Sequence, residues 1–301
     1  MQGKGLHVPA KYPPGGYLRK RFLFTSYPSL CYPTCMEDTK TNKTLVNVVL
    51  DRSGSMSDTR AGTISGFNEY LNQLRKDSKI EYSVTLIQFD SPMNNAELTI
   101  KYVDKPLAEV PELTAADYEP RGCTPLYDAI GECVRRVETK DRSVLTVIIT
   151  DGLENASREF TKESIKALIA DKEKNEHWTF AFLGADIDSY AVGGSVGVSA
   201  ANTSNYSKGN EDAMYQNLAF STMTRSALAA NRGTQCASRM DMFDDSQRAA
   251  MGGFPGSGVL PGTGGIGRTT GGCPPAAPPF RPSTRPVPVP SRKRTTWKTN
   301  V

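Results

Sequence analysis

Two runs of aliphatic and β-branched residues, at 45–50 and 144–150, constrain the fold of this 301-residue chain more than any other feature. They read Leu-Val-Asn-Val-Val-Leu and Val-Leu-Thr-Val-Ile-Ile-Thr. A half-exposed strand alternates apolar and polar residues, whereas a central parallel strand is covered on both faces and is apolar almost throughout. We therefore predict that both runs are central strands of a parallel sheet.

Helical patterns alternate with the strands. Apolar residues three and four positions apart give one apolar face in each of four segments, at 63–76, 126–137, 164–174 and 212–230. Three further strands are expected at 81–89, at 98–103 as a short edge strand, and at 178–183, and a glycine-rich turn at 193–197 predicts a short strand at 197–200. Strands that alternate with helices connect by right-handed crossovers. We predict an α/β fold with a doubly wound, mostly parallel sheet, helices on both faces and one short antiparallel edge strand.

Charge and composition divide the chain into three parts. Residues 1–43 carry seven basic and two acidic groups and are rich in Pro and Tyr; residues 236–301 carry nine and three. Residues 44–235 carry twenty basic and twenty-seven acidic groups. Ten of the twenty prolines and ten of the twenty-six glycines lie in 251–290, a composition unsuited to a packed core. We predict a basic arm at 1–43, a folded domain at 44–235 and a disordered basic tail at 236–301.

Apolar segments and cysteines bear on location. No stretch approaches the ~20 apolar residues that span a bilayer, and the apolar part of segment 19–24 is shorter than the 7–15 residues of a signal peptide. The six cysteines are scattered along the sequence. Cys31 and Cys35 could form half of a zinc site, but the chain has only two histidines and no second close cysteine pair to complete it. We expect free thiols, no transmembrane segment and a cytoplasmic location.

Oxygen-bearing side chains follow both central strands. Asp51, Ser53 and Ser55 come directly after the first strand, and Asp151 comes directly after the second. Thr124 lies in a Gly-Cys-Thr-Pro loop, where we expect it to be the N-cap of the helix, with proline as the first helical residue. Carboxylate and hydroxyl oxygens suit Mg²⁺ or Mn²⁺ and suit zinc poorly.

The ordered set Asp51-x-Ser53-x-Ser55, Thr124 and Asp151 resembles the metal-ion-dependent adhesion site of von Willebrand factor type A domains. The resemblance covers roughly residues 44–235 and extends to single-domain intracellular members from bacteria and phages. It implies a Rossmann-like fold. It also implies that the serines bind Mg²⁺ directly, that the threonine binds directly or through water, and that both aspartates act mainly through bound water.

The resemblance further implies that a partner protein fills the remaining metal position with an Asp or Glu carboxylate. We expect a non-enzymatic interaction module. A second hypothesis that the resemblance implies is a regulatory subunit or adaptor of an AAA+ ATPase, a role that some intracellular members play. The chain has no Walker A sequence, so we do not expect it to hydrolyse ATP itself. The residues also leave open a metal-dependent hydrolase, and a metal-free domain whose Asp and Ser residues cap helices. The basic tail could add weak, nonspecific contact with polyanions.

Overall fold

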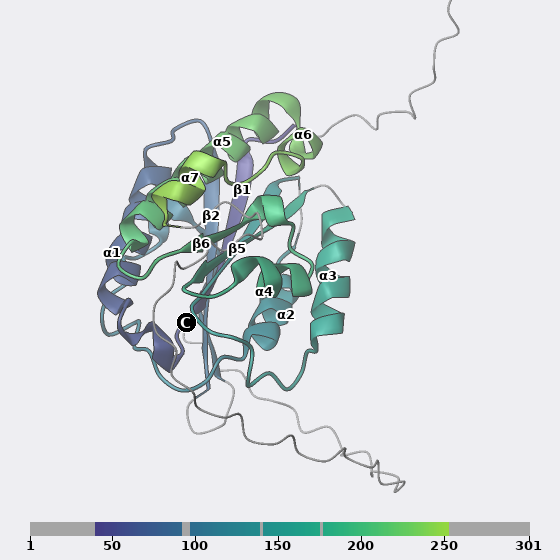
Figure 1. Ribbon diagram of the computed structural model, residues 1–301. Coiled ribbons are helices and arrows are strands. Elements are labelled where there is room, and N and C mark those ends of the chain that lie inside the picture. Colours follow the sequence, from purple (N-terminus) through teal and green to yellow (C-terminus); the bar gives the residue numbers. More distant parts are fainter. Residues whose placement is uncertain (1–39, 92–96, 139–140, 175–176, 253–301) are drawn as a thin grey trace, which may run out of the picture. The chain divides into compact units, whose positions relative to one another are not determined.

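A six-stranded sheet forms the centre of the computed structural model, which describes residues 40–91, 97–138, 141–174 and 177–252 (Figure 1). The strand order is β3-β2-β1-β4-β5-β6. All neighbours pair in parallel except β2 and β3, which pair antiparallel. The strands are β1 Lys43–Asp51, β2 Glu81–Asp90, β3 Glu97–Pro106, β4 Ser143–Thr150, β5 Trp178–Ala185 and β6 Thr203–Tyr206.

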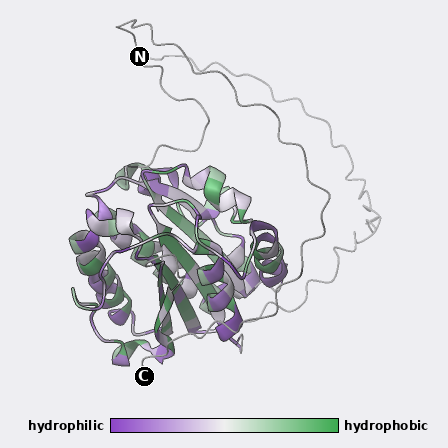
Figure 2. Ribbon diagram, turned by 90° about the horizontal axis from the view of Figure 1, so that it is seen from below, coloured by the Kyte–Doolittle hydropathy of each residue, from purple (hydrophilic) through white to green (hydrophobic). Residues whose placement is uncertain are grey.

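The central strands are buried on both faces, as their sequences predict. In β1, Val46, Val48 and Leu50 pack into one core cluster, whereas Leu45 and Val49 pack into the other. The alternation follows from the two-residue period of a strand, which sends successive side chains to opposite faces. Figure 2 shows hydrophobic strands through the middle, between helices that carry hydrophilic residues.

Helices α1 (Arg60–Arg75) and α5 (Glu211–Arg232) cover one face of the sheet, with α7 (Asp245–Ala250) beside them (Figure 1). The short helix α6 (Thr234–Ser238) packs against α5. Two aromatic residues join the larger pair, since the rings of Phe67 and Tyr215 meet edge to face at 6.4 Å. The helices approach closely at Gly66, where a Cβ would lie 2.2 Å from the Tyr215 ring.

Helices α2 (Leu126–Arg136), α3 (Lys162–Lys174) and α4 (Ser189–Ser195) cover the opposite face. Three short 3-10 helices complete the described structure: η1 Gly54–Ser57, η3 Leu107–Glu109 and η4 Ala200–Asn202. The predicted doubly wound α/β fold is confirmed, with helices on both faces. Among the described residues, no helix is long and apolar enough to cross a membrane.

Two strand predictions need correction. The edge strand is not short, because β3 has ten residues and pairs along β2 from Pro106 back to Glu97. The strand predicted at 197–200 does not form. In the structure, 193–195 end α4, Gly197 has a φ of +97°, and Ser199 caps η4 through the Ala201 N–H. Pairing with β5 begins at Thr203.

The packed domain also extends beyond residue 235. Helices α6 and α7 lie within the predicted tail, and Met242, Phe243 and Met251 are fully buried in the core beside α5. Residues 236–252 therefore belong to the domain, because their apolar side chains cover the end of the sheet near β6 and α5. Residues 1–39 of the predicted arm and residues 253–301 of the predicted tail lie outside the described residues, as do Cys31 and Cys35.

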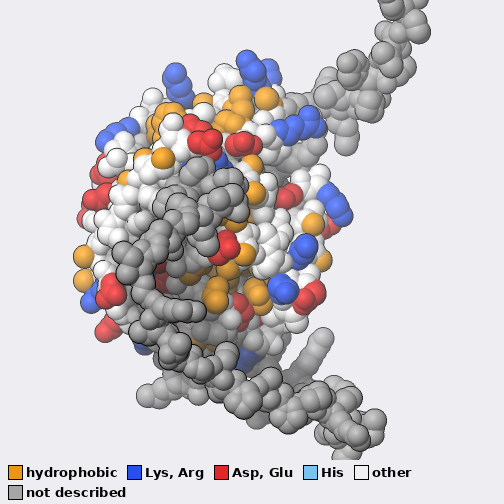
Figure 3. Space-filling model, viewed as in Figure 1, with side chains coloured by type: hydrophobic (Ala, Val, Ile, Leu, Met, Phe, Trp, Pro, Cys, Tyr) orange, Lys and Arg blue, Asp and Glu red, His pale blue; other side chains and the backbone are white. Residues whose placement is uncertain are grey.

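The described surface carries both signs of charge. Figure 3 shows acidic and basic side chains interspersed on one face, with hydrophobic atoms in small groups. The large apolar side chains that are exposed among the described residues include Leu153 and Phe220, at 59% and 65%. Leu153 follows Asp151 by two residues and therefore lies beside one of the predicted metal ligands.

Candidate metal centre

The predicted oxygen ligands gather at the carboxyl ends of β1 and β4. The two strands pair in parallel up to Leu50 and Ile149, so Asp51 and Asp151 leave the sheet at the same edge. From β1 the chain winds outward to β2 and β3, whereas from β4 it winds the other way to β5 and β6. Ligands of open parallel sheets bind where this direction reverses. The site therefore lies at the topological switch point.

Hydrogen bonds fix the Asp51 carboxylate in place. Its Oδ1 accepts from the Ser53 backbone N–H at 2.6 Å, and its Oδ2 accepts from the Thr150 hydroxyl at 2.5 Å. The Tyr118 hydroxyl donates to the Asp51 carbonyl at 2.6 Å. Both carboxylate oxygens are thus tied to the ends of β1 and β4, which leaves the group little freedom to turn.

The hydroxyls lie between the two carboxylates. Ser53 Oγ and Ser55 Oγ are 3.1 Å apart, and Ser55 Oγ donates to Asp151 Oδ1 at 2.5 Å. A Cβ placed on Gly152 would lie 3.0 Å from Thr124 Oγ1 and 3.6 Å from Ser55 Oγ. All five predicted side chains therefore come together, and the glycine leaves room beside the threonine and serine oxygens.

Burial opposes the negative charge of Asp51. Asp51 is fully buried, and this burial raises the pKa of its carboxyl group to about 7. The charge of Asp151 also raises this pKa, whereas the hydrogen bonds from Thr150 and Ser53 lower it. Asp151 has a counter-ion within the chain, because its Oδ2 lies 2.7 Å from Lys208 Nζ. Among the described residues, the donors to Asp51 are neutral, a hydroxyl and a backbone N–H, so a bound divalent cation would relieve the cost of burying its charge.

The chemistry of the donor set fits a hard divalent ion. Two carboxylates and three hydroxyls offer oxygen atoms only, which is the set that Mg²⁺ and Mn²⁺ prefer. Within the described ranges, no group of three or more His, Cys, Asp and Glu side chains is arranged to hold a metal ion. The residues therefore fit Mg²⁺ or Mn²⁺ held largely by neutral hydroxyls, and do not fit zinc.

Sequence reasoning missed the ion pairs that hold the first loop. Arg52 is 7% exposed, and its Nη2 lies 3.2 Å from Asp90 Oδ1, while Arg121 Nε donates to Asp90 Oδ2 at 2.6 Å. The Gly54 N–H donates to the Gly122 carbonyl at 3.0 Å, which joins the loop to the one that carries Thr124. The sequence does show a charged residue, Arg52, between Asp51 and Ser53, but its partner Asp90 lies 38 residues away and cannot be identified from spacing.

Asp128 anchors the loop after Asp151. Its carboxylate is buried and accepts from the backbone N–H groups of Arg158, Glu159 and Phe160 at 2.8 to 2.9 Å. This anchor draws the loop across the start of α2, so that it lies against the Thr124 loop. An acidic residue in the first turn of a helix is common, which is why the pattern did not reveal this role.

The predicted N-cap is displaced by one residue. Helix α2 begins at Leu126, so Pro125 takes the N-cap position and no side chain caps the helix from there. Glu154 accepts from the Tyr127 N–H at 2.9 Å instead. The Thr124 N–H is bound by Asn155 Oδ1 at 2.8 Å. The Thr124 hydroxyl is therefore not used as a cap and is available to the site.

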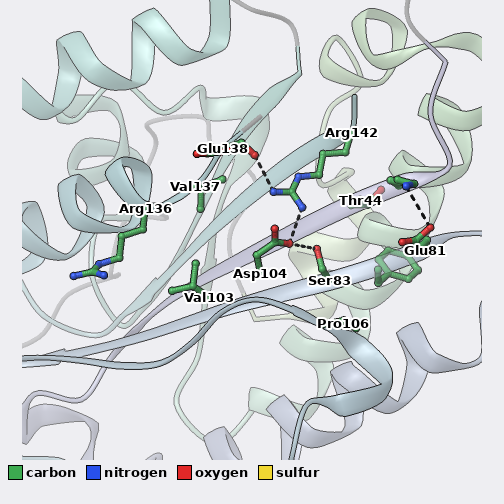
Figure 4. A pocket seen from close by; sticks show the side chains of 12 residues that line it. Thr44, Glu81, Ser83, Val103, Asp104, Pro106, Arg136, Val137, Glu138 and Arg142 are labelled. Atoms are coloured by element: carbon green, nitrogen blue, oxygen red, sulfur yellow. Dashed lines mark hydrogen bonds and ion pairs between the residues drawn. The ribbon is translucent and has the colours of Figure 1, made fainter. Parts of the chain in front are cut away.

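A hollow of about 590 Å³ lies at the opposite end of the sheet from the candidate metal centre (Figure 4). Its charged residues pair with one another: Arg142 donates to Asp104 at 2.6 Å, and Lys43 lies 3.8 Å from Glu81. The Ser83 hydroxyl donates to the same Asp104 carboxylate at 2.7 Å. Arg142 with Asp104, and Lys43 with Glu81, are thus paired within this hollow.

No family model matches this sequence, and no curated protein shows significant similarity to it. Solved structures are similar in fold. Proximal thread matrix protein 1 from the mussel byssus is 12% identical, with a TM-score of 0.45, over 61% of this chain and 47% of that one. The chain thus spans about half the length of that protein.

Two further similar structures are domains or proteins from microbes. The von Willebrand factor domain of the pilus tip protein Mfa5 from Porphyromonas gingivalis is 12% identical over 64% of this chain and 98% of that one, with a TM-score of 0.45. The manganese-loaded TRAP protein of Plasmodium vivax is 19% identical over 59% and 74%, with a TM-score of 0.42. At these scores the similarities carry no argument, and the fold class rests on the sheet topology.

Proposed function

We propose that this chain is a protein-interaction module that holds Mg²⁺ or Mn²⁺ at the switch point and binds an acidic side chain of a partner through the ion. One observation carries the proposal: Asp51, Ser53, Ser55, Thr124 and Asp151 converge from three separate loops around two buried carboxylates. The match of these five residues to the von Willebrand type A adhesion motif supports it.

Each residue has a role that follows from its contacts. The Ser53 and Ser55 hydroxyls would hold the ion directly, and the Thr124 hydroxyl lies next to them beside Gly152. The Asp51 carboxylate is held by the Thr150 hydroxyl and would balance the positive charge of the ion from the buried side of the site. When bound, the ion supplies an electrophilic position that a carboxylate oxygen can fill.

We propose binding and not catalysis, because both carboxylates already accept hydrogen bonds from neighbouring hydroxyls, Asp51 from Thr150 and Asp151 from Ser55. Leu153 is 59% exposed beside Asp151 and offers the partner an apolar contact next to the charged one. Interfaces commonly combine such an apolar anchor with a polar contact at its edge. We therefore expect the partner to present an acidic residue next to an apolar one. A cytoplasmic location is part of this proposal.

Calorimetric titration with Mg²⁺ and Mn²⁺ tests the metal site. The Ser55→Ala and Asp151→Asn variants should bind either ion much more weakly than the unaltered chain. Ser65→Ala is the matched control, because Ser65 is exposed on α1 and its hydroxyl bonds only to carbonyls of its own helix. Equal affinity in Ser55→Ala, Asp151→Asn and the control would contradict the proposed site.

Affinity capture in Mg²⁺ and in EDTA tests the partner. A protein that is retained by the unaltered chain in Mg²⁺, and lost both in EDTA and from the Asp151→Asn variant, would support metal-dependent binding. Substitution of one Asp or Glu in that protein should then abolish retention. If an ATPase is retained equally in Mg²⁺ and in EDTA, the result would instead favour the adaptor role.

A further inference from the structure

Lys208 reaches the candidate metal centre from a part of the chain that the sequence motif does not include. It lies in the turn between β6 and α5, and its Nζ is 2.7 Å from Asp151 Oδ2 and 3.2 Å from the Ser55 carbonyl oxygen. The Asp151 carboxylate is fully buried, whereas the Lys208 side chain is 29% exposed. The ammonium therefore pairs with Asp151 Oδ2, while the Ser55 hydroxyl donates to Asp151 Oδ1.

Backbone contacts hold the turn that presents this lysine. The Ser207 N–H donates to the Met251 carbonyl at 3.0 Å, and the Asn210 N–H closes the turn on the Ser207 carbonyl at 3.0 Å. Gly209 has a φ of +87°, a conformation that favours glycine, and its N–H donates to Glu211 Oε1 at 2.9 Å. These contacts fix the backbone of the turn, from which the Lys208 side chain reaches Asp151 and the Ser55 carbonyl.

Other carboxylates lie around the ammonium. Contact with Asp151 raises the pKa of Lys208, and the charges of Asp58 and Asp186 add to this rise. The latter two lie on the loops after η1 and β5, at the same edge of the sheet. An ammonium that leaves Asp151 would therefore remain in a field of negative charge, which lowers the cost of its displacement.

We infer that Lys208 is a tethered counter-ion of the metal centre: it balances Asp151 in the metal-free protein and must leave the carboxylate when a divalent ion binds. The inference rests on the proposed function, because it concerns the same site. Two cations on one carboxylate repel each other, so the ion and the ammonium compete. Lys208 thereby sets the affinity of the site for the metal.

Replacement of Lys208 by Met tests the competition, because Met keeps much of the length and loses the charge. Isothermal titration with Mn²⁺ and with Mg²⁺, at fixed ionic strength, should give the variant a dissociation constant about tenfold lower than that of the unaltered chain. This factor corresponds to about 1.4 kcal/mol, at the low end of what a hydrogen bond to a charged group contributes. Lys79→Met is the control, since Lys79 is exposed just before β2 at the opposite end of the sheet.

The melting temperature without metal provides a second readout. Lys208→Met should melt lower than the unaltered chain in EDTA, because Asp151 loses its counter-ion, and Mg²⁺ should raise its melting temperature by more. Lys208→Gln serves if the Met variant does not fold. Unchanged or weaker metal binding by the folded variant overturns the role of Lys208 and leaves the metal centre standing. Absence of binding in both the variant and the unaltered chain overturns the proposed function, and this inference with it.

Discussion

Replacement of Asp128 by Asn should loosen the loop that carries Asp151, although the side chain keeps its size. In the native protein Asp128 Oδ1 accepts from the N–H groups of Glu159 and Phe160, and Oδ2 accepts from that of Arg158. An amide offers one oxygen in place of two and directs an NH₂ group at a backbone donor. At least one charge-assisted hydrogen bond is therefore lost and replaced by an unfavourable contact.

The expected loss of stability follows from these contacts. A hydrogen bond to a charged group contributes about 1.5–3 kcal/mol, and a buried donor left without a partner costs a similar amount. Asp128 is 2% exposed, so water cannot readily replace the carboxylate. We expect the free energy of unfolding to fall by about 2–3 kcal/mol, at the lower end if the loop relaxes toward solvent.

Urea denaturation measures this change, and metal titration measures its effect on the site. The midpoint should fall with an unchanged slope, since the variant exposes the same surface on unfolding. Affinity for Mg²⁺ should fall as well, because the loop contacts Thr124 through Asn155 at 2.8 and 3.1 Å. Asp171→Asn is the control, as Asp171 is exposed on α3. A loss below about 0.5 kcal/mol, within the range of ordinary surface substitutions, would refute the role of Asp128 as loop anchor.

Two further predictions concern the core. Gly66→Ala should destabilise the protein by about 1–3 kcal/mol in denaturation, because its Cβ would meet the Tyr215 ring at 2.2 Å; a neutral effect would mean that α1 and α5 can separate without cost. The Cys133 thiol is fully buried, and burial raises its pKa to about 12, so it should react with iodoacetamide at pH 8 only after unfolding. Peptide mapping by mass spectrometry checks this, and rapid labelling of Cys133 in the native protein would contradict the packing of α2.

Much of the fold could be predicted from local patterns. The apolar runs at 45–50 and 144–150 predicted the central strands, because burial on both faces leaves a continuous apolar run. The three-four spacing at 63–76 predicted α1, because burial of one helix face leaves a regular period. Short or irregular elements left no such period. The strand Thr203–Tyr206 has four residues, and the helices of 234–250 follow a glycine and lie next to a Gly- and Pro-rich segment.

The candidate site was predictable in its ligands but not in its supports. Asp51, Ser53 and Ser55 lie within five residues of one another, and Asp151 directly follows a strand. Ends of parallel strands meet at one edge of a sheet, so the pattern itself predicts that these residues converge. Arg52 with Asp90, and Asp128 with the loop at 158–160, are separated by about thirty to forty residues, and no spacing rule joins them.

The sequence alone therefore determined the fold class and the five oxygen-bearing residues that meet at its switch point, because strand burial and strand ends are local properties of the chain. Only the tertiary structure decided that Lys208 covers Asp151, that Asp128 holds the second loop, and that residues 236–252 complete the core. Charge pairing and helix docking depend on distances in space between residues far apart in the chain. These distances are set when the sheet and its two helical layers pack together.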